Sequence, residues 1–159
     1  MSARILDGKA LAATVRLEVA RDAAVLVSRG VTPGLAVILV GDDPASAVYV
    51  RNKTRAAREA GVDAFDHHLS AQTTAAELLA LVARLNADDA VDGILLQLPL
   101  PRHLDADRIL DAIDPAKDVD GLHPDNLGRL AQARPRFIAA TPKVCMRLLA
   151  EEDAALEGA

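Results

Sequence analysis

Tyr49 and Lys53 stand four positions apart in a segment whose pattern predicts a helix, so both side chains share one helix face. An aromatic ring can stack on a flat ligand, and a partly desolvated amine beside it can exchange a proton near neutral pH. The pair therefore suits acid–base chemistry on a planar substrate. A surface tyrosine beside a solvated lysine is the alternative, and spacing alone does not exclude it.

A charged loop is predicted at residues 117–124, because Gly121 and Pro124 both interrupt regular structure. Asp118 and Asp120 have two interpretations within it. Aspartates commonly bond the backbone of their own turn. An ionised carboxylate also accepts two N–H groups side by side, which makes it a natural partner for an amino-heterocycle.

Gln97 stands at the end of an apolar run, and Leu98 and Pro99 follow it. An uncharged amide at this point can hold a lysine in its working position. It can equally bond to the loop backbone, and the sequence leaves both interpretations open.

Apolar patterns predict the elements that must position these residues. Strands separated by helices predict a three-layer αβα fold with a mainly parallel sheet, in which ligands bind beyond the carboxyl ends of the strands. The predicted strands cover residues 35–40, 62–69 and 93–98. The predicted helices cover residues 8–29, 45–60, a segment opened by a capping box at 74–77, 106–113, and a last segment from a cap at Thr141 and Pro142 to about 152.

Composition limits the possible partners. The chain has 159 residues and a net charge of -5, and it contains no basic run, which argues against nucleic acid. No apolar run approaches the roughly 20 residues of a membrane span, and no leader-like segment begins the chain, so a cytoplasmic protein is expected. Cys145 is the single cysteine, so we expect no disulfide and no thiolate zinc site, and we expect its side chain in the core.

No metal site is predicted from the histidines either. His67 and His68 are adjacent in a predicted strand, so their side chains should point to opposite faces and cannot share one metal ion. His123 lies in the charged loop, where a structural role is expected.

Three motifs, taken together, resemble the catalytic domain of the bifunctional methylenetetrahydrofolate dehydrogenase/methenyltetrahydrofolate cyclohydrolase family (FolD-type). They are the stretch from Val40 to Lys53, the run Gly93-Ile-Leu-Leu-Gln-Leu-Pro-Leu-Pro101, and the loop Lys117-Asp-Val-Asp-Gly-Leu-His-Pro124. The resemblance covers the chain from Ile5 to about Leu149.

The resemblance implies an aminoacid dehydrogenase-like N-terminal domain that interconverts one-carbon tetrahydrofolates, with a place in purine biosynthesis. One step passes hydride from methylene-tetrahydrofolate to NADP, and the other hydrolyses methenyl-tetrahydrofolate to the 10-formyl form. Lys53 would be the general acid/base, Tyr49 would stack on the folate ring and Gln97 would bond to Lys53. Asp120 would bind the amino-pterin edge, with Leu98 and Pro99 also at the substrate. Family members are usually homodimers.

The sequence departs from the family pattern in two places. Where the family has Pro-Cys-Thr-Pro-x-Gly after Phe137, this chain has Ala139-Ala-Thr-Pro-Lys-Val144, and the branched Val144 is expected to crowd a helix start near the ligand. Residues 1–150 are interpreted as the catalytic domain and 151–159 as the lead-in to an absent NADP-binding Rossmann domain. No glycine-rich phosphate turn is present, so dehydrogenase activity is not expected from this chain alone.

Two alternatives to an enzyme remain open: a folate-binding or dimer-forming module without turnover, and an engineered scaffold. Loss of a second domain would expose apolar surface, so self-association is expected.

Overall fold

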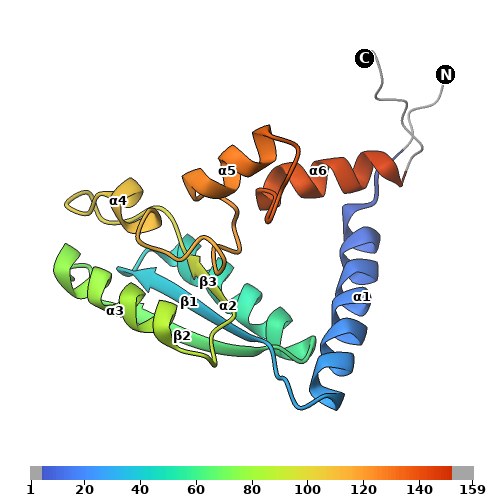
Figure 1. Cartoon of the computed structure of the whole chain (residues 1–159), viewed down its shortest axis with the longest axis horizontal. Helices are drawn as coiled ribbons and strands as arrows, with labels where there is room; N and C mark the ends of the chain where they lie inside the picture. The colour runs from blue at the N-terminus through green and yellow to red at the C-terminus, as the bar shows by residue number, and fades with distance from the viewer. Residues whose placement is uncertain (1–4, 152–159) are drawn as a thin grey trace.

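The computed structural model describes residues 5–151, in which three parallel strands form a sheet in the order β2-β1-β3 (Figure 1). The strands are β1 (Gly34–Val40), β2 (Asp63–Leu69) and β3 (Gly93–Leu96). The central strand β1 starts in register with β2 at Gly34 and Asp63, and with β3 at Leu35 and Gly93. The predicted α/β fold with a parallel sheet is confirmed.

Helices cover both faces of this sheet. Helices α3 and α4 lie over one face and α2 lies over the other, while α1 and α6 contact each other at the margin of the molecule (Figure 1). The helix bounds are α1 (Gly8–Ser28), α2 (Pro44–Glu59), α3 (Ala75–Ala87), α4 (Ala106–Leu110), α5 (Pro124–Ala131) and α6 (Ala140–Ala150).

The core forms between the sheet and helices α3 and α4, and β1 is buried on both of its faces. Ile38 belongs to the core cluster on the α3 side, whereas the neighbouring Val37 and Leu39 face α2. Double burial explains why the β1 sequence is a continuous apolar run without alternation. The cluster comprises Ala36, Ile38, Val40, Leu78, Leu81, Val82, Leu85, Val91, Ile94, Leu96, Leu104, Ile109 and Ile113.

Local capping sets the starts of the two helices nearest the sheet. The predicted capping box of α3 is present, with Thr74 and Glu77 bonding each other's backbone N–H groups. Asp43 caps α2, and Pro44 occupies its first turn. The backbone N–H of Ser46 holds the pKa of the Asp43 carboxyl below its usual value, since it favours the ionised form.

Helix α5 was not expected, because Pro124 was interpreted as a residue that breaks regular structure. The proline instead occupies the first turn of α5, where its missing N–H costs nothing. His123 is the N-cap, and its Nδ1 accepts the N–H of Asp125 at 3.0 Å, which is the structural role expected of this histidine. Helix α4 ends at Leu110, and turns continue the chain to residue 113.

The outermost helices bury less than their sequences predicted. Only Ala23 of α1 is buried, and Val19 and Leu26 remain 43% and 40% exposed, although both belong to its apolar stripe. Helix α6 has no buried residue, so the prediction of a core position for Cys145 is wrong. An apolar stripe favours burial, but no other described element covers these faces.

The start of α6 also differs from the prediction. Its N-cap is Ala139, which has no side-chain cap bond, and the helix begins at Ala140. Thr141 is therefore already helical and is not the cap. Val144 is 57% exposed, so the expected crowding at this position does not occur among the described residues.

Candidate active site

Lys53 and Gln97 are 44 positions apart in sequence but contact each other in the structure. Lys53 Nζ donates a hydrogen bond to Gln97 Oε1 at 3.1 Å. Helix α2 carries the lysine, and the end of β3 carries the glutamine. Both interpretations of Gln97 therefore hold, each for one end of its amide. The oxygen binds the lysine, and the nitrogen Nε2 binds the loop backbone, donating to the carbonyl of Leu98 at 2.6 Å. The amide is thus oriented with its oxygen toward the ammonium.

The strand that carries Gln97 is shorter than predicted, but its pairing extends to this residue. β3 ends at Leu96, yet the Gln97 N–H still donates to the carbonyl of Ile38 at 2.9 Å. The Leu98 side chain packs against the core, and Pro99 is exposed. This backbone hydrogen bond to β1 therefore holds Gln97 at the carboxyl end of β3.

The charged loop enters the site beside β3. The Ile94 N–H donates to the carbonyl of Lys117 at 2.7 Å, and Ile94 and Asp118 form an isolated parallel bridge. Gly93 permits this approach, because a Cβ at that position would overlap Val119 Cγ1. The first residues of β3 and the start of the charged loop consequently lie side by side.

Asp118 and Asp120 have different environments. Asp118 is 2% exposed, and its Oδ1 accepts the N–H of Gly121 at 3.1 Å, as a turn aspartate does. Asp120 is half-buried. Burial raises the pKa of the Asp120 carboxyl, the ammonium of Lys53 opposes this rise, and the charge of Asp118 adds to it. The carboxyl of Asp120 and the ammonium of Lys53 therefore lie close enough to interact electrostatically.

Tyr49 lies one helical turn before Lys53 on α2 and is 63% exposed. Its ring is open to solvent rather than packed in the core. The geometry fits both interpretations of this residue, a surface tyrosine and a ring available for stacking.

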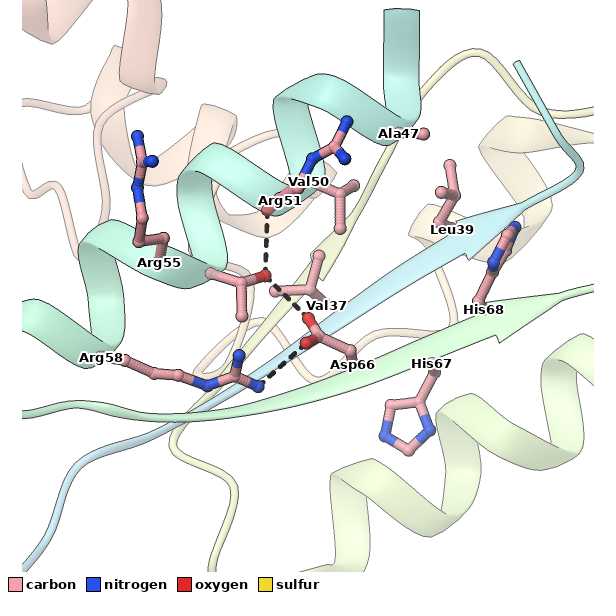
Figure 2. A pocket seen from close by; sticks show the side chains of 11 residues that line it. Val37, Leu39, Ala47, Val50, Arg51, Arg55, Arg58, Asp66, His67 and His68 are labelled. Atoms are coloured by element: carbon pink, nitrogen blue, oxygen red, sulfur yellow. Dashed lines mark hydrogen bonds and ion pairs between the residues drawn. The ribbon is translucent and has the colours of Figure 1, made fainter. Parts of the chain in front are cut away.

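A pocket of about 400 Å³ lies elsewhere, between α2 and β2, and contains none of the predicted site residues (Figure 2). Asp66 is at its centre, where Thr54 Oγ1 donates to it at 2.7 Å and Arg58 Nη2 at 2.9 Å. Arg58 also donates to the carbonyl of Ala64 on the outer edge of β2, and such cover discourages pairing with another strand.

The two adjacent histidines of β2 point in opposite directions, as predicted (Figure 2). His68 Nε2 lies 2.9 Å from the carbonyl oxygen of Gly41, whereas His67 Nε2 is buried without a hydrogen-bond partner among the described residues. Within residues 5–151, no group of three or more histidine, cysteine, aspartate or glutamate side chains could hold a metal ion. No helix in the same range is long and apolar enough to cross a membrane.

Residues 6–120 match the family described as tetrahydrofolate dehydrogenase/cyclohydrolase, catalytic domain. The chain belongs to this family. Among its curated members, "Bifunctional protein FolD 2" of Pseudomonas savastanoi pv. phaseolicola is 55% identical over 158 residues, which are 99% of this chain and 53% of that protein. "Bifunctional protein FolD" of Acidiphilium cryptum is 57% identical over 159 residues, or 56% of its length. The chain thus spans about half the length of the curated relatives it matches.

Solved structures of the tetrahydrofolate dehydrogenase/cyclohydrolase family share the fold. The bifunctional FolD enzyme of Campylobacter jejuni matches with a TM-score of 0.94 and 45% identity, over 96% of this chain and 55% of that one. The Trypanosoma brucei enzyme, described as complexed with NADP cofactor and inhibitor, matches with a TM-score of 0.92 and 37% identity, over 96% and 53%. Both matches support the αβα architecture described above.

Sequence reasoning missed Asn126, which is fully buried at the edge of the site. Its Nδ2 donates to Asp118 Oδ2 at 2.9 Å. An isolated asparagine gives no periodic signal. The Pro124 that places it on a helix was interpreted as a break, although a proline after a capping residue also marks a helix start.

Proposed function

We propose that this chain carries the folate-binding and catalytic part of a methylenetetrahydrofolate dehydrogenase/cyclohydrolase. The proposal covers oxidation of 5,10-methylene-tetrahydrofolate to the 5,10-methenyl form and hydrolysis of that form to 10-formyl-tetrahydrofolate. The observation that carries it is the 3.1 Å bond between Lys53 and Gln97 in a site that Asp120 also faces, within a chain of this family.

Lys53 is the proposed general acid/base. Hydrolysis of the methenyl form adds water across a C–N bond, so one group must take a proton from the water and return one to the ring nitrogen that leaves. An amine can perform both transfers in turn. The Gln97 oxygen accepts one N–H of Lys53 and leaves its other N–H groups free for the substrate.

Asp120 and Tyr49 are the proposed pterin contacts. The amino-pterin edge presents parallel N–H donors, which an ionised carboxylate accepts side by side. The exposed ring of Tyr49 lies on the same helix face as Lys53 and can stack on the flat heterocycle. Leu98 and Pro99, next to Gln97, complete the proposed substrate contacts.

NADP is the cofactor that accepts hydride in the proposed oxidation. The described residues do not fit a dinucleotide site, because the chain contains no Gly-x-Gly-x-x-Gly turn that would bring backbone N–H groups to a pyrophosphate. We therefore assign NADP binding to no residue between 5 and 151.

The proposal also includes a homodimer and a cytoplasmic location with a role in purine biosynthesis. Exposed apolar side chains on α1 support association of copies of the chain. The family membership supports the metabolic role.

Replacement of Lys53 tests the proposed chemistry. Lys53→Ala should lower methenyl-tetrahydrofolate hydrolysis about 10²- to 10⁴-fold, the usual contribution of a positioned acid/base. The measurement is the loss of methenyl absorbance over time, with Lys143→Ala on exposed α6 as the matched control. Hydrolysis that is equal in the wild-type chain and Lys53→Ala would favour a binding module without turnover.

A further inference from the structure

Asp118 is almost fully buried but has no part in the proposed chemistry. The hydrogen bonds that its carboxylate accepts within the described residues come from uncharged N–H groups. Oδ1 accepts from Gly121, and Oδ2 accepts from the His123 N–H at 2.8 Å and from Asn126 Nδ2 at 2.9 Å. A turn aspartate needs only the backbone donors. The third donor comes from helix α5 and ties the loop to that helix.

Asn126 bonds to two points of the chain that precede Asp120. The side chain is 0% exposed, and its Nδ2 donates to the Pro115 carbonyl at 2.9 Å as well as to Asp118. Arg136 Nη1 lies 3.4 Å from Asn126 Oδ1. This contact fixes which end of the amide is the donor, so one side chain joins the residues before the loop to the carboxylate inside it.

Asp120 lies within the segment that these bonds enclose. On its carboxyl side, the Gly121 N–H donates to both the carbonyl and the carboxylate of Asp118, at 3.3 and 3.1 Å. The Asp120 carbonyl itself accepts the N–H of Ala140 at 3.3 Å. With the backbone held on both sides, the Asp120 side chain leaves the loop in a fixed direction.

We propose that Asp118 and Asn126 form a positioning pair that holds the Asp120 carboxylate in its ligand-binding direction. The inference rests on the proposed function of Asp120 and deepens it. A carboxylate that is already oriented loses less freedom when ligand binds, so the pair contributes to affinity without touching the ligand.

Asn126→Ala tests the pair, with Asn86→Ala as the matched control. Asn86 also makes two hydrogen bonds, to Ala112 and Asp114, away from Asp120. In Asn126→Ala, amide hydrogen exchange at Gly121 should become at least tenfold faster, while that of Ile38 in β1 stays unchanged. The carboxyl titration of Asp120, followed by NMR, should move toward that of an ordinary aspartate as the loop opens. Lys53 of α2 and Asp118 of the same loop are the charged groups that face Asp120, and both remain.

The affinity for a stable folate analogue should fall at least fivefold in Asn126→Ala and remain within twofold in Asn86→Ala. If Asn126→Ala does not fold, the isosteric Asp118→Asn gives the exchange and affinity readouts, because an amide nitrogen then faces N–H donors. The titration of Asp120 is read only in Asn126→Ala, since loss of the Asp118 charge by itself lowers the pKa of the Asp120 carboxyl. Unchanged exchange at Gly121 and unchanged affinity for the analogue in the variant that folds would overturn the positioning role. Analogue binding that survives Asp120→Ala would contradict the proposed function of Asp120 instead, so the two failures differ.

Discussion

At the residue scale, the site combines groups whose charges and donors fit a planar, amino-substituted ligand. Lys53 receives its orientation from one neutral oxygen of Gln97, and Asp120 is kept half-buried near the ammonium. The burial of Asp120 does not benefit the fold by itself. Burial of an ionisable carboxyl opposes its ionisation, so the chain retains a group that the proposed ligand binding needs and folding does not.

Asp120→Asn should therefore raise the stability of the ligand-free chain at neutral pH. Because burial raises the pKa of this carboxyl above its usual 3.8, ionisation costs stability above the raised value. The cost disappears as the pH falls below 3.8, where the carboxyl is protonated in both the folded and the unfolded chain. We expect a Tm increase of about 1–3 °C at pH 7, a small gain because the group is only half-buried.

Thermal unfolding at pH 7 and at about pH 3.5, below the usual carboxyl pKa, measures this difference. Asp89→Asn, at an exposed aspartate, is the control for loss of one negative charge. A Tm that is lower in Asp120→Asn than in the wild type at pH 7 would show that the ionised carboxylate stabilises the fold, which is the opposite of the expected effect.

At the element scale, the site depends on how closely the 117–120 segment approaches β3. A Cβ at Gly93 would overlap Val119, so glycine at this position lets the loop pair with the start of β3 at Ile94. The sequence predicted that this loop and the stretch after β3 converge, because both follow strand ends or lie near them in a parallel sheet. It did not predict the close approach of Val119 to Gly93, since the sequence pattern does not indicate which residues of the loop and the strand lie against each other.

Gly93→Ala should destabilise the chain by about 1–3 kcal/mol, the usual cost of inserting a methyl group into a packed position. The displaced segment carries Asp120, so analogue affinity should fall as well. Gly128→Ala on α5 is the matched control, because no atom lies within 4 Å of its Cβ position, and alanine there should be neutral or stabilising. Urea unfolding checks both variants. Equal midpoints for Gly93→Ala and wild type would mean that the loop does not need this close approach.

Some elements were predictable and others were not, for physical reasons. Strand β1 and the capping box of α3 followed from local patterns that burial and hydrogen bonding require. The exposure of Cys145 on α6 could not be predicted in this way. An apolar helix face favours burial, but its sequence does not indicate which element, if any, covers it. The Lys53–Gln97 contact was expected from the resemblance and from general chemistry, whereas the buried Asn126 had no signal except the proline two residues before it.

At the scale of the whole molecule, the described residues leave considerable apolar surface uncovered. Helix α1 exposes large aliphatic side chains around much of its circumference, and only Ala23 is buried. Soluble monomers rarely expose large contiguous apolar patches. The exposed members of α1 are Leu17, Val19, Val25, Leu26 and Val27.

Self-association through α1 is therefore the expected state of this chain at micromolar concentration. Val19 and Leu26 lie seven positions apart and share a helix face, so Val19→Lys with Leu26→Lys should shift the chain toward monomer in sedimentation velocity. Val48→Lys on α2, at a similarly exposed position, should not. A wild-type chain that sediments as a monomer at micromolar concentration would contradict this expectation.

The most direct test of the central claim is a calorimetric titration of this chain with a stable folate analogue, beside Asp120→Ala. We predict measurable binding by the wild-type chain and at least tenfold weaker binding by the variant, because the carboxylate proposed to accept the pterin N–H groups is gone. Absence of binding by the wild-type chain, or equal affinity in both proteins, would contradict the proposed folate site.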